Sequence, residues 1–360
     1  MSCNHRSVRQ QHCRTLFLFP HTMKRYTLTL AIIASLLLVG CKPKDPIRLV
    51  GEAQGTYYTV AYYDTHNRNF QQSIDSLLDA FDQIASLWVD SSMIRRVNGN
   101  ADNHINTLFA DLLSKSMQIN QYTEGAFDCR VGRLVQAWGF SFKKKETLSQ
   151  SQIDTFLTAA KGQLSIDTLD DGSMILIKGN PATEIDFNAI AQGYAVDLVS
   201  QYLDRKGIKS YLVDIGGEVI SKGRKADGSL WSVGVEQPSE NKYSQPQIAL
   251  KIGLENASIV TSGNYRKYYE KEGVRYSHTI DPETGHPVNH TLLSASVVDS
   301  TAWRADALAT AIMVMGVEKA KAFIAAHPED PALQRVHLIY DSCGTYCSYS
   351  TPEFQHLIIK

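Results

Sequence analysis

The most constraining feature of this sequence is a run of predicted strands with no helical segment between them. The run lies between predicted helices at 189–205 and 304–327. Parallel neighbours would need a crossover helix after each strand, whereas consecutive strands pair readily as antiparallel neighbours. The sequence therefore predicts an α+β fold, in which mixed or antiparallel sheets pack against helices. The predicted strands are 211–219, which paired glycines break, 230–238, 247–254 and 257–263. A hairpin at 268–280 turns through Lys271, Glu272 and Gly273.

Helical spacing of apolar residues marks the elements outside this run. From Phe70 to Trp88 apolar side chains recur on one face, which predicts an amphipathic helix. The segment 125–140 has no clean period. Further helices are predicted at 107–122 and 149–161, and short strands at 55–64, 173–179 and 336–341.

The composition is that of a globular protein with no charge signature of a nucleic-acid partner. The 360 residues are 43% hydrophobic, and the net charge is -1. This length is sufficient for one large domain or two smaller ones. A balanced charge gives no support for binding to nucleic acid.

A short apolar segment precedes the globular part. From Met23 to Cys41 the chain reads MKRYTLTLAIIASLLLVGC, with a basic start, an apolar core and a small-residue ending. This pattern is typical of a signal peptide rather than of a membrane-spanning helix. The ending LVGC resembles a bacterial lipobox, which predicts that Cys41 is lipidated and begins the mature protein. A plain signal peptide with a chance cysteine is the alternative.

These features predict the organisation of the chain. Residues 1–22 lie upstream of a better start at Met23 and are interpreted as an extension that does not belong to the protein. A signal peptide at 23–40 and a lipidated tether at 41–50 then precede one domain at 51–360. The mature protein is expected outside the cytoplasm, on the periplasmic side of a bacterial membrane that holds its lipid anchor.

Two cysteines near the C-terminus leave two readings open. Cys343 and Cys347 flank Gly-Thr-Tyr in a predicted turn. In an oxidising compartment they would form a small disulfide, and two free thiols are the alternative. Two close ligands are too few to predict a metal site.

Two acidic residues are candidates for contacts with a ligand. Asp128 ends the turn sequence GAFD, where an acid alternatively caps its own backbone. Asp186 lies in EIDFNAIAQGYAVD, ahead of a helix predicted to begin near Ala189. An acid in that place is either a ligand contact or a group favoured by the helix dipole.

Two further clusters point to catalysis and to a cation. His278 and Asp281 lie in SHTIDPETGHPV, where DPETG is a strong turn signal. Asp306 and Thr310 are four residues apart on a predicted helix, so their oxygens face the same way. A carboxylate and a hydroxyl among alanines suit Mg²⁺, which keeps waters or binds phosphates. A first-turn Asp and a Thr bonded to its own helix are the alternative.

Six segments occur in an order that resembles a known family. GAFD, IDFNAIAQGYAVD, VDIGGEV, TSGNY, HTIDPETGHPV and ADALATA follow the order found in the ApbE family, the FAD:protein FMN transferases. The resemblance covers nearly everything from Gly51 to the C-terminus. The lipobox is consistent with it, since many members of that family are periplasmic lipoproteins.

The resemblance implies a fold, a reaction and a set of partners. An ApbE-like fold places the cofactor between two lobes. Members bind FAD and Mg²⁺, move FMN onto a Thr or Ser hydroxyl of a target protein and release AMP. Their targets include flavin-carrying subunits of membrane redox complexes.

The resemblance also implies roles for individual residues. The metal would be held by the main-chain oxygen of Ala189 and by the side chains of Asp306 and Thr310, and His278 would be catalytic. Positions that would contact FAD are Gln54, Trp88, Ala126, Phe127, Asp128, Asp186 and Gln192.

The sequence departs from the family at several cofactor positions. The family often has Lys at Gln192, Met at Gln54 and Tyr at Trp88, and Cys129-Arg130 replaces a commoner Pro-Thr pair. Gln192 can donate a hydrogen bond but carries no charge. These departures touch contacts with the cofactor and leave Asp306, Thr310 and His278 intact.

Two other functions are the alternatives to transfer. A Mg²⁺-dependent FAD pyrophosphatase would use water as the acceptor and release FMN and AMP. A lipoprotein that only binds flavin would need neither His278 nor a metal pair, so the intact set favours an enzyme.

Overall fold

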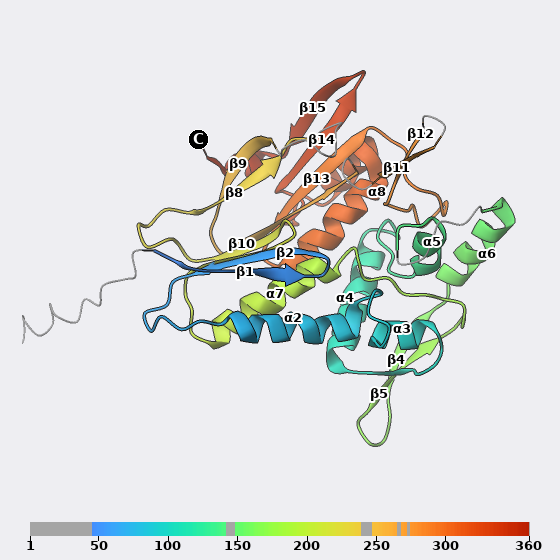
Figure 1. Ribbon diagram of the computed structural model, residues 1–360. Coiled ribbons are helices and arrows are strands. Elements are labelled where there is room, and N and C mark those ends of the chain that lie inside the picture. The colour runs from blue at the N-terminus through green and yellow to red at the C-terminus, as the bar shows by residue number, and fades with distance from the viewer. Residues whose placement is uncertain (1–44, 142–147, 239–246, 265–267, 272–273, 360) are drawn as a thin grey trace, which may run out of the picture. The chain divides into compact units, whose positions relative to one another are not determined.

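Eight antiparallel strands form the central sheet of the protein (Figure 1). The computed structural model describes residues 45–359 apart from 142–147, 239–246, 265–267 and 272–273. The predicted extension, the signal peptide and Cys41 therefore lie outside the described residues. In spatial order the strands are β1 (Ile47–Ala53), β2 (Thr56–Tyr62), β6 (Tyr211–Ile215), β7 (Glu218–Lys222), β10 (Ala257–Gly263), β13 (Leu292–Asp299), β14 (Val336–Ser342) and β15 (Thr345–Ser350).

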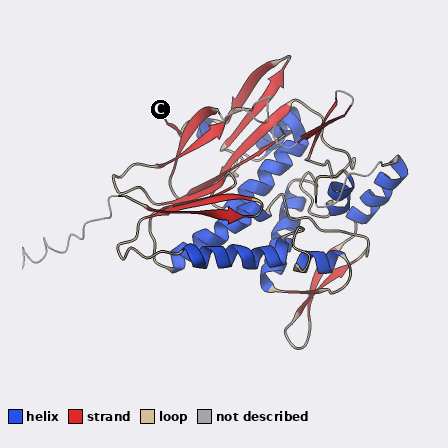
Figure 2. Ribbon diagram, viewed as in Figure 1, coloured by secondary structure: helices blue, strands red, loops and turns tan. Residues whose placement is uncertain are grey.

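Helices cover one face of this sheet (Figure 2). Their apolar sides share one buried cluster with the sheet, in which Tyr58, Leu78, Val199 and Leu308 are at most 2% exposed. None of the helices in the described part of the chain is both long and apolar enough to cross a bilayer. The helices of this layer are α2 (Gln71–Ala85), α4 (Thr107–Tyr122), α7 (Ala191–Arg205) and α8 (Ala302–Ala326).

A small sheet packs on the opposite face through a second apolar cluster. Val235 and Ile252 of the small sheet meet Val219, Ile259 and Val298 of the large one. The core is thus a layer on each side of the central sheet, as an α+β fold requires. The small sheet consists of β8 (Trp231–Glu236), β9 (Ile248–Leu254) and β16 (Ile358–Ile359).

The remaining elements surround the edge of these layers. A three-stranded sheet has the order β3 (His104–Ile105), β5 (Met174–Lys178) and β4 (Leu164–Thr168), and β11 (Tyr268–Lys271) pairs with β12 (Val274–Ser277). A third apolar cluster joins Leu134, Ile153 and Ile280. The short helices are α3 (Met93–Asn98), α5 (Gly132–Ala137), α6 (Gln150–Ala160) and α9 (Pro352–Gln355).

The predicted α+β class is confirmed, and the predicted elements differ from the observed ones mainly at their ends. The helix predicted over 70–88 ends at Ala85, because Ser86 takes an extended conformation (ψ 128°). Trp88 therefore lies outside the helix. The predicted helix at 189–205 begins at Ala191, and the hairpin predicted at 268–280 corresponds to β11 and β12.

The structure adds detail at two places. Strand β1 begins at Ile47 and pairs with β2, so the last residues of the segment predicted as a tether at 41–50 lie in the sheet. The predicted strand at 211–219, which paired glycines were expected to break, is a hairpin. Gly216 (φ 65°) and Gly217 (φ 110°) form its turn, and a positive φ at both central residues suits a two-residue hairpin loop.

The C-terminal hairpin bears on the cysteines. β14 and β15 are joined at Cys343 and Gly344, both with positive φ. Cys343 and Cys347 are free thiols, so the structure favours the second of the two readings.

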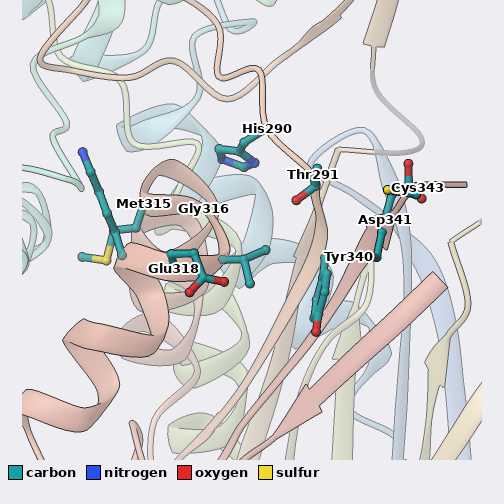
Figure 3. Close-up of a pocket in the computed structure, with 11 residues that line it drawn as sticks. His290, Thr291, Met315, Gly316, Glu318, Tyr340, Asp341 and Cys343 are labelled. Atoms are coloured by element: carbon teal, nitrogen blue, oxygen red, sulfur yellow. The ribbon is translucent and has the colours of Figure 1, made fainter. Parts of the chain in front are cut away.

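Helix α8 is interrupted at Gly316, where φ is 72° and ψ is 178°. His290 approaches the interruption, and its Nε2 lies 2.7 Å from the Met313 carbonyl oxygen. A Cβ at Gly316 would lie 2.9 Å from the imidazole ring, so glycine is needed there. A pocket of about 480 Å³ opens beside this point, between α8, Thr291 and the end of β14 (Figure 3). None of the predicted site residues lines it.

Candidate functional site

The segment from Glu184 to Gly193 connects most of the predicted site. The Asp186 N–H donates to the Cys129 carbonyl oxygen (2.7 Å), and the Gly132 N–H donates to the Glu184 carbonyl oxygen (3.1 Å). These bonds hold the GAFD segment beside the EIDF segment. The two motifs are more than 50 residues apart in the chain, so only the tertiary fold brings them together.

Asp128 caps its own turn and is also ion-paired. Its Oδ1 accepts from the Arg130 N–H (2.9 Å), which is the local capping weighed from the sequence. Its Oδ2 lies 2.8 Å from Arg130 Nη2. Phe127 is 2% exposed and Ala126 packs partly buried against the main core. The departure at Arg130 thus supplies the positive charge beside the family's acid.

Asp186 is buried and only half satisfied. Its side chain is 6% exposed, and Oδ1 accepts from the Asn188 N–H (2.8 Å). Oδ2 is buried and has no hydrogen-bond partner among the described residues. Burial raises the pKa of this carboxyl to about 6, because the charged form loses its hydration. Asp186 lies ahead of α7 and does not cap it, since Ile190 is the N-cap residue.

The start of α7 is tied to α8 through a carboxylate. The Gly193 N–H donates to Asp306 Oδ2 (3.0 Å), and the first intrahelical bond of α7 runs from Tyr194 to Ile190. The carbonyl oxygen of Ala189 therefore receives no bond from Gly193, as it would inside a continuous helix. The backbone acceptor of Ala189 thus lies four residues before the glycine that contacts the Asp306 carboxylate.

Gly193 allows this close approach. A Cβ there would lie 2.4 Å from the Ala302 carbonyl oxygen and 2.8 Å from the Asp306 Cβ. Asp197, one turn further along α7, accepts from the Ala302 N–H (3.0 Å) and the Trp303 N–H (2.9 Å). Asp197 therefore caps the start of α8 from the neighbouring helix, and both helices are fixed at the site.

Asp306 has the features of a cation ligand. It is 5% exposed, and burial raises the pKa of its carboxyl to about 7. Oδ1 accepts no hydrogen bond from the described residues. Thr310 lies one turn later, with its hydroxyl 3.4 Å from the Ser262 hydroxyl at the end of β10. A buried acid without a countercharge and a neighbouring hydroxyl fit Mg²⁺, which would supply the missing positive charge.

The set is small. No group of three or more His, Cys, Asp or Glu side chains suited to a metal occurs in the described part of the chain. The predicted set has one carboxylate, one hydroxyl and one carbonyl. Such a set leaves coordination positions for water or phosphate oxygens.

Gln192 reaches from α7 to the glycine turn between β6 and β7. Its Nε2 donates to the Ile215 carbonyl oxygen (2.8 Å). A Cβ on Gly216 would lie only 1.9 Å from that nitrogen. The amide therefore occupies space that only glycine leaves open, and the VDIGGEV motif supports the site rather than merely turning the chain.

Gln54 and Trp88 are on elements other than α7 and α8. Gln54 begins the β1–β2 turn with φ 54°, and its backbone and side-chain N–H groups donate to the Asp82 carboxylate. Its Oε1 is buried without a partner among the described residues. Trp88, between α2 and α3, is 56% exposed. An indole so exposed leaves a face on which a planar ring can stack.

A hydrogen bond attaches the loop that carries His278 to the residue that follows β10. Thr279 Oγ1 donates to Asn264 Oδ1 (3.0 Å), two residues after Ser262. Asp281 caps its own turn by accepting from the Glu283 N–H (2.8 Å). His278 is half-buried and meets Phe140 edge-on, with 6.5 Å between ring centroids. The Thr279–Asn264 bond thus attaches the His278 loop just after β10, the strand that carries Ser262.

Sequence reasoning missed several residues that build this site. Gly193 and Asp197 fix α7 against α8, and Asn98 holds the EIDF segment by exchanging two hydrogen bonds of 2.8 Å with the backbone of Ile185. The signal for Gly193 was a glycine inside a helical pattern. Such a glycine lowers helix stability, so its presence indicates close packing at that position. Nothing local distinguished Asn98 or Asp197.

The architecture and the site define a class of protein known from solved structures. Over 87% of this chain and 96% of the other, the fold matches the apo form of the flavinyl transferase ApbE from Pseudomonas stutzeri, with a TM-score of 0.74 and 31% identity. The flavin transferase ApbE from Vibrio cholerae also matches with a TM-score of 0.74, at 30% identity over 88% of this chain and 100% of that one.

The chain belongs to the ApbE family. The family model matches residues 54–333. Among relatives, the FAD:protein FMN transferase of Vibrio cholerae serotype O1 is 36% identical over 338 residues, which are 92% of this chain and 98% of the relative. The FAD:protein FMN transferase of Escherichia coli K12 is 31% identical over 353 residues, covering 93% and 98% of the two chains. The resemblance drawn from the six motifs is confirmed.

Proposed function

We propose that this protein is an FAD:protein FMN transferase, which moves the FMN part of FAD onto a Thr or Ser hydroxyl of a target protein and releases AMP. Membership of the ApbE family and the names of its relatives support this reaction. The chain spans 98% of the length of both relatives.

The observation that carries the proposal is the junction of α7 and α8. There Asp306 and Thr310 lie on α8, Ala189 lies just before α7, and the Gly193–Asp306 bond joins the two helices. Mg²⁺ held by these three groups would supply positive charge to the pyrophosphate oxygens of FAD. The buried, unpartnered oxygens of Asp186 and Gln54 are acceptors for donor groups of the bound nucleotide.

The protein's own part in the chemistry is to position the reactants and move a proton. His278 accepts, directly or through a neighbour, the proton of the attacking hydroxyl. The oxygen then attacks the FMN phosphorus, and the bond to the AMP oxygen breaks. Trp88 stacks on a ring of FAD, and Gln192, Ala126, Phe127 and Asp128 border the nucleotide.

The proposed setting is the periplasmic side of a bacterial membrane. Lipid on Cys41 anchors the protein, and a flavin-carrying subunit of a membrane redox complex is the acceptor. The LVGC sequence supports the anchor. No role with nucleic acid is proposed, since the net charge is -1.

An acceptor assay tests the reaction. The protein is incubated with FAD and Mg²⁺, with and without a flavin-acceptor subunit, and the products are read by mass spectrometry. Transfer predicts FMN covalently attached to a Thr or Ser of the acceptor, together with AMP. Free FMN and AMP without a modified acceptor would indicate a pyrophosphatase instead, and bound FAD with no AMP would indicate a binding protein.

Replacing the proposed base gives the first specific prediction. His278→Ala is expected to lower the transfer rate by ~10²–10⁴, the usual contribution of a general base, while FAD still binds. Single-turnover transfer and FAD fluorescence titration measure the two quantities. His286→Ala, in the same loop and packed on Trp138, is the control and keeps its rate. Transfer at the wild-type rate in His278→Ala would remove the residue from the mechanism.

A further inference from the structure

One end of the central sheet gathers loops from distant parts of the chain. The strand register places Ile47, Tyr62, Tyr211 and Lys222 in one row across β1, β2, β6 and β7. The segments 63–68, 204–210 and 222–228 lie at this end and are here called the basic end. Figure 1 shows the start of β1, the start of α2 and the end of α7 on the same side of the molecule.

Hydrogen bonds make these loops one surface. The Tyr63 N–H donates to the Ser210 carbonyl oxygen (3.0 Å), and Arg68 Nη2 donates to the Lys206 carbonyl oxygen (3.0 Å). The Ser210 hydroxyl donates to the Arg224 carbonyl oxygen (2.6 Å). Hydrogen bonds from the backbone and from two side chains therefore hold these segments together, and Arg68 is engaged by them.

The basic end is strongly positive although the whole chain is nearly neutral. Its three loops contain seven Lys or Arg against three Asp, whereas the chain has a net charge of -1. Some of this charge is neutralised locally by ion pairs such as Lys222–Asp204. Arg205, Lys206 and Lys209 are exposed, and no ion pair joins them to any residue that the structure describes.

The chain outside the described residues limits where this surface can lie. Ile47 begins β1 only six residues after Cys41. An extended chain spans at most ~3.3–3.6 Å per residue, so the row at Ile47 lies within about 20 Å of a lipid on Cys41. A surface so close to a bilayer is exposed to the potential of its headgroups, which attracts Lys and Arg.

We propose that the basic end rests on anionic lipid headgroups of the membrane that carries the anchor. This inference depends on the lipid anchor of the proposed function. It also sets the height of the active site. Helix α7 runs from the Asp306 junction to Arg205, and its 15 residues span roughly 20 Å at 1.5 Å per residue.

Lysine labelling of the full, acylated chain tests the orientation. The protein is reconstituted into vesicles of phosphatidylcholine alone or of phosphatidylcholine with phosphatidylglycerol, and amine modification of each Lys is measured by mass spectrometry. Lys206 and Lys209 are expected to react several-fold more slowly on the anionic vesicles, and high salt should remove the difference. The exposed Lys161 and Lys319 serve as references and should react equally on both.

Variants separate the surface from the anchor. In Lys206→Gln/Lys209→Gln the protection of Lys225 should weaken, whereas the matched pair Lys161→Gln/Lys319→Gln keeps it. Equal labelling of Lys206 and Lys209 on both vesicles overturns the proposal, as does equal protection of Lys161 and Lys319. The mass of the Cys41 peptide reports acylation independently. If acyl groups are absent, the anchor fails, and salt-sensitive sedimentation with the anionic vesicles still tests the surface.

Discussion

At the scale of single residues, the site is marked by buried acids without a positive partner. Asp186 and Asp306 are both at most 6% exposed, and burial raises the pKa of each carboxyl, to about 6 and about 7. Keeping such groups ionised costs free energy that an apo protein does not recover. A bound cation or a ligand with several hydrogen-bond donors would offset this cost of burying charge, so the buried acids favour binding.

The cost of burying this charge predicts how Asp306→Asn changes the stability of the protein. Asparagine can still accept from the Gly193 N–H, so the helix junction remains. Without metal the variant should be more stable than the wild type at pH 8, since position 306 no longer carries a buried charge. Mg²⁺ should stabilise only the wild type, by about 2.7 kcal/mol at a hundredfold excess over Kd. Thermal unfolding with and without Mg²⁺ measures both effects. An equal Mg²⁺ shift in the two proteins would exclude Asp306 from the ligand set.

A second prediction concerns the glycine turn at Gln192. Gly216→Ala would place a methyl group 1.9 Å from Gln192 Nε2 and should displace this side chain. Gly217→Ala is the control, because its φ is also positive (110°) but nothing lies within 4 Å of its Cβ position. FAD titration should show weaker binding for Gly216→Ala than for Gly217→Ala. Equal affinities would mean that Gln192 does not contribute to the cofactor contact.

At the scale of elements, the structure is organised around the contact of α7 with α8. Gly193 permits the approach, the Gly193–Asp306 bond ties the helices, and Asp197 caps the start of α8. The helical periodicity of α7 and α8 could be predicted because each buries an apolar face. The point where the two helices cross could not be predicted. It depends on the absence of a side chain at Gly193 and on the cap that Asp197 of α7 supplies to α8.

Gly193→Ala tests this contact. The added Cβ would meet the Ala302 carbonyl oxygen at 2.4 Å, and overpacking of this kind costs roughly 1–3 kcal/mol. Urea unfolding is expected to show that loss, together with weaker Mg²⁺ binding because Asp306 moves. Ser200→Ala, on the same helix, is the control for metal binding and should leave it unchanged. A Gly193→Ala protein with unchanged stability and unchanged Mg²⁺ affinity would contradict the packing argument.

At the scale of the whole molecule, the far end of the large sheet gives stability a dependence on pH. His337 of β14 is 3% exposed, stacks on Phe354 of α9 and lies 2.7 Å from the Ser350 hydroxyl of β15. Burial lowers the pKa of this imidazole from 6.5 to about 4. The charged form therefore favours the unfolded chain, and stability is full above about pH 6.5 and falls as the pH drops toward 4.

The effect can be isolated by comparing variants. Between pH 7.5 and pH 5 the His337 contribution amounts to about 2 kcal/mol of unfolding free energy, from ~1.4 kcal/mol per pKa unit. His337→Asn should lose less stability over this interval than the wild type, whatever its stability at pH 7.5. His356→Asn, at an exposed histidine, should keep the wild-type dependence. Urea unfolding at the two pH values provides the measurement, and parallel losses in all three proteins would refute the assignment.

The sequence by itself determined the class of fold and the chemistry available to it. Consecutive strands predicted an α+β protein because antiparallel pairing is local, and six ordered motifs identified the family and its residue types. Strands β1 and β13 are two of those that were not predicted, and each has a reason in the sequence. β1 begins inside the segment assigned to the tether, and β13 is buried along most of its length, so it shows little alternation.

Only the tertiary structure decided how those residues meet. GAFD lies beside EIDF through the Asp186–Cys129 bond, and Asp306 reaches the start of α7 only because residue 193 is a glycine. The exposed position of Trp88 likewise follows from the end of α2 at Ala85. Periodicity records which face of an element is buried. It does not record which other element buries it, and that contact between distant segments is what assembles the site.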